Sequence, residues 1–112
     1  SAVATAVHAG DHPIYPDCRP AFIEAIEHEA RIGNEGFIAD GFRVLAPFLA
    51  VGKDEIVRRG AAVDVPFAQT WSCYVGGERH CGRCGTCVER REAFELAGVA
   101  DPTAYEAGGE AA

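Results

Sequence analysis

The sequence lacks an excess of positive charge, lacks long apolar runs, and has few cysteines outside one short stretch. Among 112 residues, 17 acidic and 10 basic side chains give a formal net charge of −7. A protein that binds a nucleic-acid backbone usually has the opposite balance, so we do not expect that class. No apolar run approaches the length of a membrane span. Residues 1–10 are apolar but have no basic segment, so we expect no signal peptide. The length allows one domain with a modest core.

The cysteines are unevenly placed, since four of the five fall within residues 73–87. Seven, two and two residues separate successive thiols in this stretch. Two intervening residues let the backbone turn and aim both sulfurs at one point, as a tetrahedral metal site requires. Gly82 and Gly85 each follow a cysteine and would permit turns with positive φ. The pattern predicts a structural Zn²⁺ site with four thiolate ligands, Cys73, Cys81, Cys84 and Cys87.

A helix is expected directly after this loop, from residue 87 to residue 97, with Gly98 ending it. Thr86 has the character of its N-cap, and Glu89 would complete a capping box. Cys87 then lies in the first turn, where the helix dipole favours a thiolate. Four thiolates on one zinc ion leave about two negative charges. The cations expected to compensate them are Arg79, Arg83, Arg90 and Arg91.

Three alternatives to a zinc site with four cysteines remain open. Cys18 makes the number of cysteines odd and nothing suggests secretion, which weakens disulfide pairing. A 4Fe–4S cluster is weakened because the ferredoxin-type run that ends in Cys-Pro is absent. His80 could replace one sulfur. It is adjacent to Cys81, however, so we interpret it as a solvated residue or a neighbour of the ligands. Free thiols beside a metal site indicate a reducing, cytoplasmic setting.

The first part of the chain has the pattern of a parallel α/β sheet. Residues 2–7 are small and β-branched without alternation, as in a strand covered on both faces. The loop HAGDH follows at the carboxyl end of this strand, where open α/β sheets bind ligands. Its His8 and His12 are ligand contacts or plain loop polarity. We expect a helix from Pro20 to Gly33, a strand at residues 42–48 and a helix at residues 53–62.

Single residues in these elements have both a structural and a functional interpretation. Asp17 is an N-cap of the helix that begins at Pro20, or a ligand contact. Cys18 has the character of a small buried hydrophobe. Lys53 lies at the start of its helix, where the dipole disfavours a cation, so it is a solvated lysine or a functional one. Trp71 is expected to pack under the cysteine loop. We divide the chain into a sheet region at 1–69, a zinc-binding lobe at 70–105 and a disordered tail at 106–112.

Four segments, in the order found here, carry a family resemblance. They are YPDCRPAFIEA at residues 15–25, KDEIV at 53–57, TWSCY at 70–74 and CGRCGTC at 81–87. The combination closely resembles the later half of 7-cyano-7-deazaguanine synthase, a zinc-containing ligase of queuosine and 7-deazapurine biosynthesis. The resemblance covers nearly the whole chain. It implies a partial adenine-nucleotide α-hydrolase-like (Rossmannoid) parallel sheet with helices, followed by a C-terminal zinc knuckle of four cysteines and a helix.

The resemblance also implies an activity and its cofactors. A member of this family makes 7-cyano-7-deazaguanine from 7-carboxy-7-deazaguanine and ammonia, uses ATP and Mg²⁺, and is a cytoplasmic homodimer that serves tRNA modification. The zinc would be structural, which agrees with four thiolates that close the coordination sphere. Asp17, Cys18 and Arg19 would contact the substrate, and Lys53 would approach a phosphate. No residue is assigned to proton transfer.

The largest departure from the family is the missing pyrophosphate loop of the form S-G-G-x-D-S. Such a loop holds the phosphates of ATP with backbone N–H groups. We therefore expect a fragment, a split subunit or a decayed relative, which pairs with a missing N-terminal half or with a second copy and does not bind ATP alone. Two alternatives are a non-catalytic zinc module that binds another protein, favoured if an apolar patch is exposed near Trp71, and a related ligase with a different amine acceptor.

Overall fold

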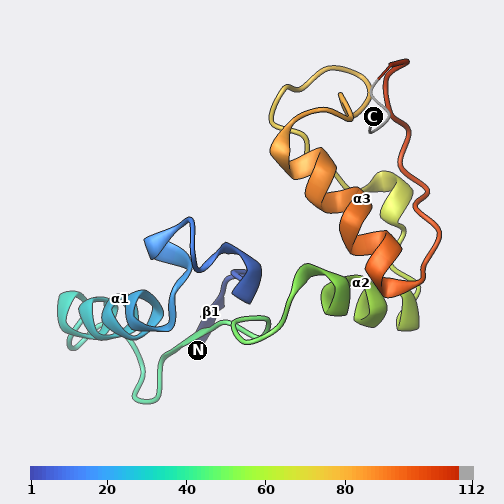
Figure 1. Cartoon of the computed structure of the whole chain (residues 1–112). Coiled ribbons are helices and arrows are strands. Elements are labelled where there is room, and N and C mark those ends of the chain that lie inside the picture. Colours follow the sequence, from blue (N-terminus) through green and yellow to red (C-terminus); the bar gives the residue numbers. More distant parts are fainter. Residues whose placement is uncertain (109–112) are drawn as a thin grey trace. The chain divides into compact units, whose positions relative to one another are not determined.

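The structure is a computed structural model that describes residues 1–108. The chain divides into two compact units at Gly52/Lys53. This boundary lies upstream of the one at 69/70 that the sequence suggests, so the helix at residues 53–62 belongs with the cysteine loop and not with the sheet. No helix within residues 1–108 is both long enough and apolar enough to cross a lipid bilayer. The elements in chain order (Figure 1) are β1 Ala2–Ala4, η1 Ala9–Asp11, η2 Pro16–Cys18, α1 Pro20–Gly33, β2 Arg43–Leu45, α2 Lys53–Ala62, η3 Phe67–Gln69 and α3 Gly85–Ala97, where η is a 3-10 helix.

The first unit contains a two-stranded parallel sheet. β1 and β2 pair in the register Ala2↔Arg43, Val3↔Val44 and Ala4↔Leu45. This confirms a parallel sheet with helices, but both strands are shorter than the sequence suggests. All three residues of β1 are exposed, so the expectation of a strand covered on both faces is wrong for this chain. Short apolar runs do not distinguish a covered strand from an open one, because both have the same composition.

Helix α1 begins with Pro20 at its first position, where the missing N–H is not needed. Its carboxylate Glu27 joins it to the sheet, accepting from the backbone N–H of Val44 at 2.8 Å and from Nε of Arg43 at 3.3 Å. The bond from the Val44 amide lowers the pKa of Glu27 below its usual range. Arg31, one turn later, donates to the Phe42 carbonyl at 2.7 Å. Polar contacts at helix and strand edges therefore fix α1 against β2.

The second unit is built on the packing of α2 against α3. Val57 from α2 and Ala93 and Phe94 from α3 form a buried cluster. Phe67 of η3 meets Phe94 edge to face, with the ring centroids 5.1 Å apart. Edge-to-face pairs add about 0.5–1.5 kcal/mol beyond the burial of their area. A small aromatic core therefore holds the two helices and η3 together.

Helix α3 starts two residues earlier than expected. Its N-cap is Cys84, and no side chain caps it. The expectation that Thr86 and Glu89 form a capping box is wrong, because the helix already includes Gly85 and Thr86. The placement of Cys87 in the first helical turn is confirmed. Gly98 ends the helix in the left-handed conformation at φ 69°, as its sequence position indicates.

The segment after α3 returns to the cysteine loop. His80 and Tyr105 form an isolated parallel bridge, and the N–H of Glu106 donates to the His80 carbonyl at 2.8 Å. The tail expected to be disordered from residue 106 therefore begins with a hydrogen-bonded residue. Its residues 109–112 lie outside the part of the chain that the structure describes.

Gly60 on α2 tests the packing of the second unit. A Cβ at this position would lie 2.5 Å from Cζ of Phe67, so Gly60→Ala should displace the ring that meets Phe94. We expect a loss of about 1–3 kcal/mol in the free energy of unfolding, against the gain of up to about 1 kcal/mol usual for this change in a helix interior. Urea unfolding measures it. Gly33→Ala in α1 is the control, because nothing lies within 4 Å of a Cβ there. Equal stability of the two variants would contradict the packing described here.

Candidate functional site

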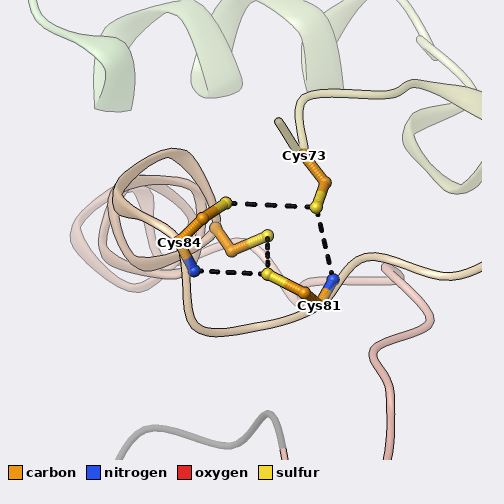
Figure 2. Close-up of side chains that lie close together, drawn as sticks. Cys73, Cys81 and Cys84 are labelled. Carbon is orange, nitrogen blue, oxygen red and sulfur yellow. Dashed lines mark hydrogen bonds between the residues drawn. The ribbon is translucent and has the colours of Figure 1, made fainter. Parts of the chain in front are cut away.

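Four cysteine sulfurs converge on one point in the second unit. The Sγ atoms of the four residues all lie within 4.8 Å of one another. Cys81 Sγ is 4.0 Å from Cys87 Sγ, and Cys84 Sγ is 3.9 Å from Cys73 Sγ. A tetrahedral zinc site with Zn–S bonds of about 2.3 Å has sulfur–sulfur edges of about 3.8 Å. The arrangement (Figure 2) therefore fits a tetrahedral metal ion, and the four cysteines can hold a metal such as zinc. All five cysteines are free thiols, so the disulfide alternative is wrong.

Backbone amides surround the sulfur of Cys81. The N–H groups of Arg83 and Cys84 both lie 3.3 Å from Cys81 Sγ, and the Cys81 N–H lies 3.4 Å from Cys73 Sγ. Gly82 lets the chain turn back in this way, with φ 74°. The same expectation for Gly85 is wrong, because Gly85 is the first residue of α3 and its φ is not positive.

The thiols of Cys73, Cys84 and Cys87 differ in their tendency to ionise. Contacts with the Thr86 side chain and then with the amides of Tyr74 and Cys87 lower the pKa of Cys84 to about 5. The Cys81 amide likewise lowers the pKa of Cys73. Burial raises the pKa of Cys87 to about 12, and Cys87 is fully buried. A buried thiolate at Cys87 therefore needs a cation beside it, which is what a bound metal ion supplies.

The arginines near the loop do not compensate the sulfurs as expected. Arg79 is exposed, and Arg83 lies 3.8 Å from Glu106. Arg91 donates to the Gly82 carbonyl at 2.9 Å and stacks over Tyr105. Arg90 is buried and donates to hydroxyls and a carbonyl. The expectation is therefore corrected for Arg83, Arg90 and Arg91, and the amides described above are the donors that face the sulfurs.

His80 lies beside the ligands without joining them. It is 4% exposed, and its Nε2 accepts the N–H of Ser72 at 3.2 Å. Burial and the positive charge of Arg90 lower its pKa. Trp71 stacks on it with centroids 4.3 Å apart and donates to the Cys73 carbonyl at 2.9 Å. The interpretation of His80 as a neighbour of the ligands is consistent with this position, whereas the solvated alternative is wrong. Trp71 packs beside the loop with half of its surface exposed.

Lys53 is engaged by a side chain of the same unit. Its Nζ lies 2.8 Å from Oε2 of Glu89. The two residues are the first residue of α2 and a residue of the second turn of α3. This ion pair joins α2 to α3, and Glu89 makes it in place of the expected capping interaction. The helix dipole disfavours a cation at the position of Lys53, and the Glu89 carboxylate stabilises the cation there.

The three adjacent candidate residues Asp17, Cys18 and Arg19 lie in the first unit, at η2 and the start of α1. Arg19 is the N-cap residue of α1, and no side chain caps the helix, so the capping interpretation of Asp17 is wrong. Arg19 donates from Nε to the His12 carbonyl at 2.7 Å. Cys18 is half-buried, with its sulfur 3.9 Å from Oδ1 of Asp17. Burial, and then the charges of Asp17 and Asp11, raise its pKa.

Asp17 lines a cavity of about 290 Å³ within the first unit. The apolar side of α1 and the residues of the two strands form most of its wall. Phe22 and Ile26, which are more than 40% exposed, face this space. The lining residues are Val3, Thr5, Val7, Asp17, Phe22, Ile23, Ile26, Ala30, Phe42 and Val44. One carboxylate and one threonine in a mostly apolar cavity are the arrangement of a pocket for a small molecule with few polar groups.

A known protein family matches most of the chain. The family model described as "Queuosine biosynthesis protein QueC" matches residues 1–98. The chain belongs to the QueC family. Similar curated proteins are named 7-cyano-7-deazaguanine synthase. They include proteins of Allorhizobium ampelinum, 65% identical over 105 residues, of Rhizobium meliloti, 64% identical over 105 residues, and of Paracoccus denitrificans, 62% identical over 105 residues.

Each of these alignments covers 94% of this chain but 44% of the relative. The chain therefore spans less than half the length of the QueC relatives that it matches. No solved structure matches the chain significantly. Within the QueC family match lie all four cysteines and the residues Asp17, Cys18, Arg19 and Lys53.

Proposed function

We propose that this chain is part of a ligase that makes 7-cyano-7-deazaguanine from 7-carboxy-7-deazaguanine and ammonia, for queuosine biosynthesis and tRNA modification. One observation carries the proposal: 94% of the chain aligns at 61–65% identity with proteins named for this product. The reducing, cytoplasmic setting that free thiols indicate is part of the proposal.

The chemistry explains why such an enzyme needs ATP and Mg²⁺. Turning a carboxylic acid and ammonia into a nitrile removes both carboxyl oxygens, and neither leaves as free hydroxide. Transfer of a phosphoryl or adenylyl group from ATP makes each oxygen a good leaving group. The first activation lets ammonia attack and gives the amide, and the second removes the amide oxygen. Mg²⁺ neutralises the phosphate charges during both steps.

In this proposal the zinc ion is structural. Four protein thiolates fill a tetrahedral coordination sphere and leave no position for substrate or water. The ion would join the first turn of α3, through Cys87, to the loop that begins at Cys73. Its contribution is to hold the N-terminus of α3 and the residues that pack on it, including His80 and Tyr105.

The cavity in the first unit is our proposed contact point for the deazaguanine ring. The pyrimidinone edge of such a ring presents an N–H and an amino group side by side, which one carboxylate can accept together. Asp17 is the carboxylate of the cavity, and Phe22 offers an aromatic face. Cys18 and Arg19 would support Asp17 from the same turn. Lys53 would reach a phosphate only after leaving Glu89.

The ATP-binding part of the enzyme is proposed to correspond to the length of the relatives that this chain does not match. This sequence contains no S-G-G-x-D-S loop, and its alignments leave more than half of each relative uncovered. We propose that this chain alone does not bind ATP, and that it functions joined to, or paired with, the remaining part of a QueC protein. A homodimer is proposed for the complete enzyme.

A chimera tests this function. The part of the Allorhizobium ampelinum relative that precedes the aligned region is fused to this chain, and 7-cyano-7-deazaguanine is measured by mass spectrometry with ATP, Mg²⁺, ammonium and the acid. We expect the chimera to form the nitrile and Asp17→Asn in the chimera to raise KM for the acid. The chain alone should form none and show no micromolar binding of an ATP analogue. A folded, zinc-containing chimera without product would overturn the proposal.

An exposed apolar patch favours a second candidate function. Trp71, Tyr74 and Val75 on the cysteine loop are 50%, 80% and 68% exposed. Such a patch suits a zinc module that binds another protein. Under this alternative the folded chimera lacks activity, while Tyr74→Ser weakens capture of a partner. A ligase with another amine acceptor is distinguished in the same assay, because its product with an added amine has a different mass.

A further inference from the structure

The two outer edges of the β1–β2 sheet differ in what occupies their backbone groups. On β2, the N–H of Val44 faces away from β1 and donates to Oε2 of Glu27 at 2.8 Å. The carbonyl of Phe42, on the same side, accepts from Nη2 of Arg31 at 2.7 Å and from its Nε at 3.1 Å. Side chains of α1 therefore close the outer edge of β2 at two groups with which a further strand would need to pair.

The outer edge of β1 has no such cover. The carbonyl of Ser1 accepts from the N–H of Arg43 at 3.3 Å. The N–H of Thr5 donates to the Leu45 carbonyl at 2.8 Å, so the odd-numbered residues of β1 face β2. Backbone groups alternate in direction along a strand, and those of Ala4 therefore face away from β2. Outside the ladder with β2, residues 1–108 make no hydrogen bond to the N–H or the carbonyl of Ala4. The sheet is thus open to a further strand beside β1.

One face of the sheet is open as well. Val3 and Thr5 line the cavity at α1. Since side chains alternate along a strand, Ala2 and Ala4 point to the opposite face. The register places Leu45 beside Ala4 on that face. All three side chains are exposed, and that of Leu45 is 45% exposed. A parallel sheet is normally covered on both faces, and the small side chains of alanine leave room for a helix to approach closely.

We propose that the outer edge of β1 and the face formed by Ala2, Ala4 and Leu45 dock the part of the enzyme that this chain does not match; this inference rests on the proposed function. That part adds a strand beside β1, which pairs with the backbone of Ala4, and a helix over the exposed face. Length determines the choice of occupant, because the alignments cover 44% of each relative and leave more than half of it unmatched. Since β1 also lines the cavity that contains Asp17, the added strand borders the proposed substrate pocket.

Amide hydrogen exchange, followed by NMR, measures directly whether the edge of β1 is occupied. In this chain alone the N–H of Ala4 should exchange rapidly, because nothing accepts it. In the chimera with the Allorhizobium ampelinum part, its exchange should slow by about 10²-fold or more, since an amide bonded inside a sheet exchanges only when the sheet opens. The N–H groups of Thr5 and Val44 are internal references, because their acceptors belong to this chain and are present in both proteins.

Ala4→Pro tests the same edge by removing its donor. Proline is compatible with an edge strand whose N–H faces solvent, but not with a central strand. The melting temperature of this chain alone should therefore change little, whereas that of the chimera should fall by about 5 °C or more. Circular dichroism measures both. Ala104→Pro is the matched control, because Ala104 is exposed and its N–H makes no hydrogen bond within residues 1–108. It should leave both melting temperatures unchanged.

The possible results separate this docking surface from its alternatives. Rapid exchange at Ala4 in a folded chimera, or equal effects of Ala4→Pro and Ala104→Pro on its melting temperature, would overturn the proposal. Slow exchange at Ala4 in this chain alone, with a dimer found by analytical ultracentrifugation, would overturn it in favour of a second copy at the edge. A chimera that does not fold would count against the docking surface. A folded chimera with slow exchange at Ala4 but without product would support the docking surface and contradict the proposed function.

Discussion

Chelation of the metal, or Cys81→Ser, should unfold the segment from Thr70 to Ala97. Cys81 is 1% exposed, and its sulfur faces two backbone amides and the sulfur of Cys87. A structural zinc site contributes about 10–16 kcal/mol of apparent binding free energy, which equals or exceeds the roughly 5–15 kcal/mol of net stability of a domain. Metal content by mass spectrometry and thermal unfolding by circular dichroism, each with and without chelator, measure the effect. Acidification should release the ion in the same way, because protons compete for the thiolates.

Cys18→Ser is the matched control for Cys81→Ser. Cys18 belongs to the first unit, and its sulfur has only a long contact of 3.9 Å to Asp17. The substitution should leave the metal content at one zinc per chain and shift the melting temperature little. Equal destabilisation by the two substitutions would show that the ligand assignment is wrong. If the purified protein were coloured and contained iron, the four cysteines would hold an iron–sulfur cluster and not a zinc ion.

The sequence was sufficient to locate the cysteine cluster because its signal is local. Four thiols within fifteen positions, and a glycine after Cys81 that adopts positive φ, nearly determine that the sulfurs meet. The sequence indicates Thr86 as the N-cap of α3, whereas the N-cap is Cys84, because the cysteine loop continues directly into the helix. Glu89 was then assigned to a cap, whereas its partner is Lys53, 36 residues earlier. Pairings over that distance leave no periodic signal in one sequence.

In the first unit, too, the sequence predicts the kind of element but not how far it is buried. Composition identified a parallel sheet, yet each strand is only three residues long, β1 is exposed, and in β2 only Val44 is half-buried. Phe22, Ile23 and Ile26 of α1 all line the cavity, but only Ile23 is buried. The spacing of apolar residues shows which side of a helix is apolar, but it does not show which residues pack against that side. His8 and Asp11 likewise come together, with 3.1 Å between Nε2 and Oδ2, only because the chain turns at η1.

Arg90→Ala should destabilise the second unit by at least about 3 kcal/mol, since hydrogen bonds to a charged group contribute about 1.5–3 kcal/mol each. Arg90 is 9% exposed. Its guanidinium donates to Thr103 Oγ1 at 2.7 Å, to Thr70 Oγ1 at 2.8 Å and to the Phe67 carbonyl at 2.9 Å. It therefore joins α3 to η3 and to the C-terminal segment. The sequence indicates the sulfurs as the neighbours of Arg90, but its hydrogen-bond partners lie 13 to 23 residues away, a separation that leaves no local pattern.

Arg90→Lys separates the charge from the hydrogen-bonding geometry. Lysine keeps the charge but cannot reproduce the planar fork, so this variant should lose most of the stability that Arg90→Ala loses in urea unfolding. Arg59→Ala is the control, because Arg59 is exposed and pairs with Glu55, an arrangement that contributes about 0–1 kcal/mol. If Arg90→Ala cost no more than Arg59→Ala, the buried network would not stabilise the unit.

The charge of Arg90 has a second, pH-dependent consequence through His80. Burial first, and then Arg90, lower the pKa of His80 below its ordinary 6.5. Between the lowered folded pKa and 6.5 the unfolded chain binds more protons, so the free energy of unfolding falls as the pH drops through 6.5. NMR titration of His80 should give a higher pKa in Arg90→Ala than in the wild type, provided the variant is folded at low temperature. An unchanged pKa would show that the charge of Arg90 does not lower the pKa of His80, and that Arg90 acts on the unit through its hydrogen bonds only.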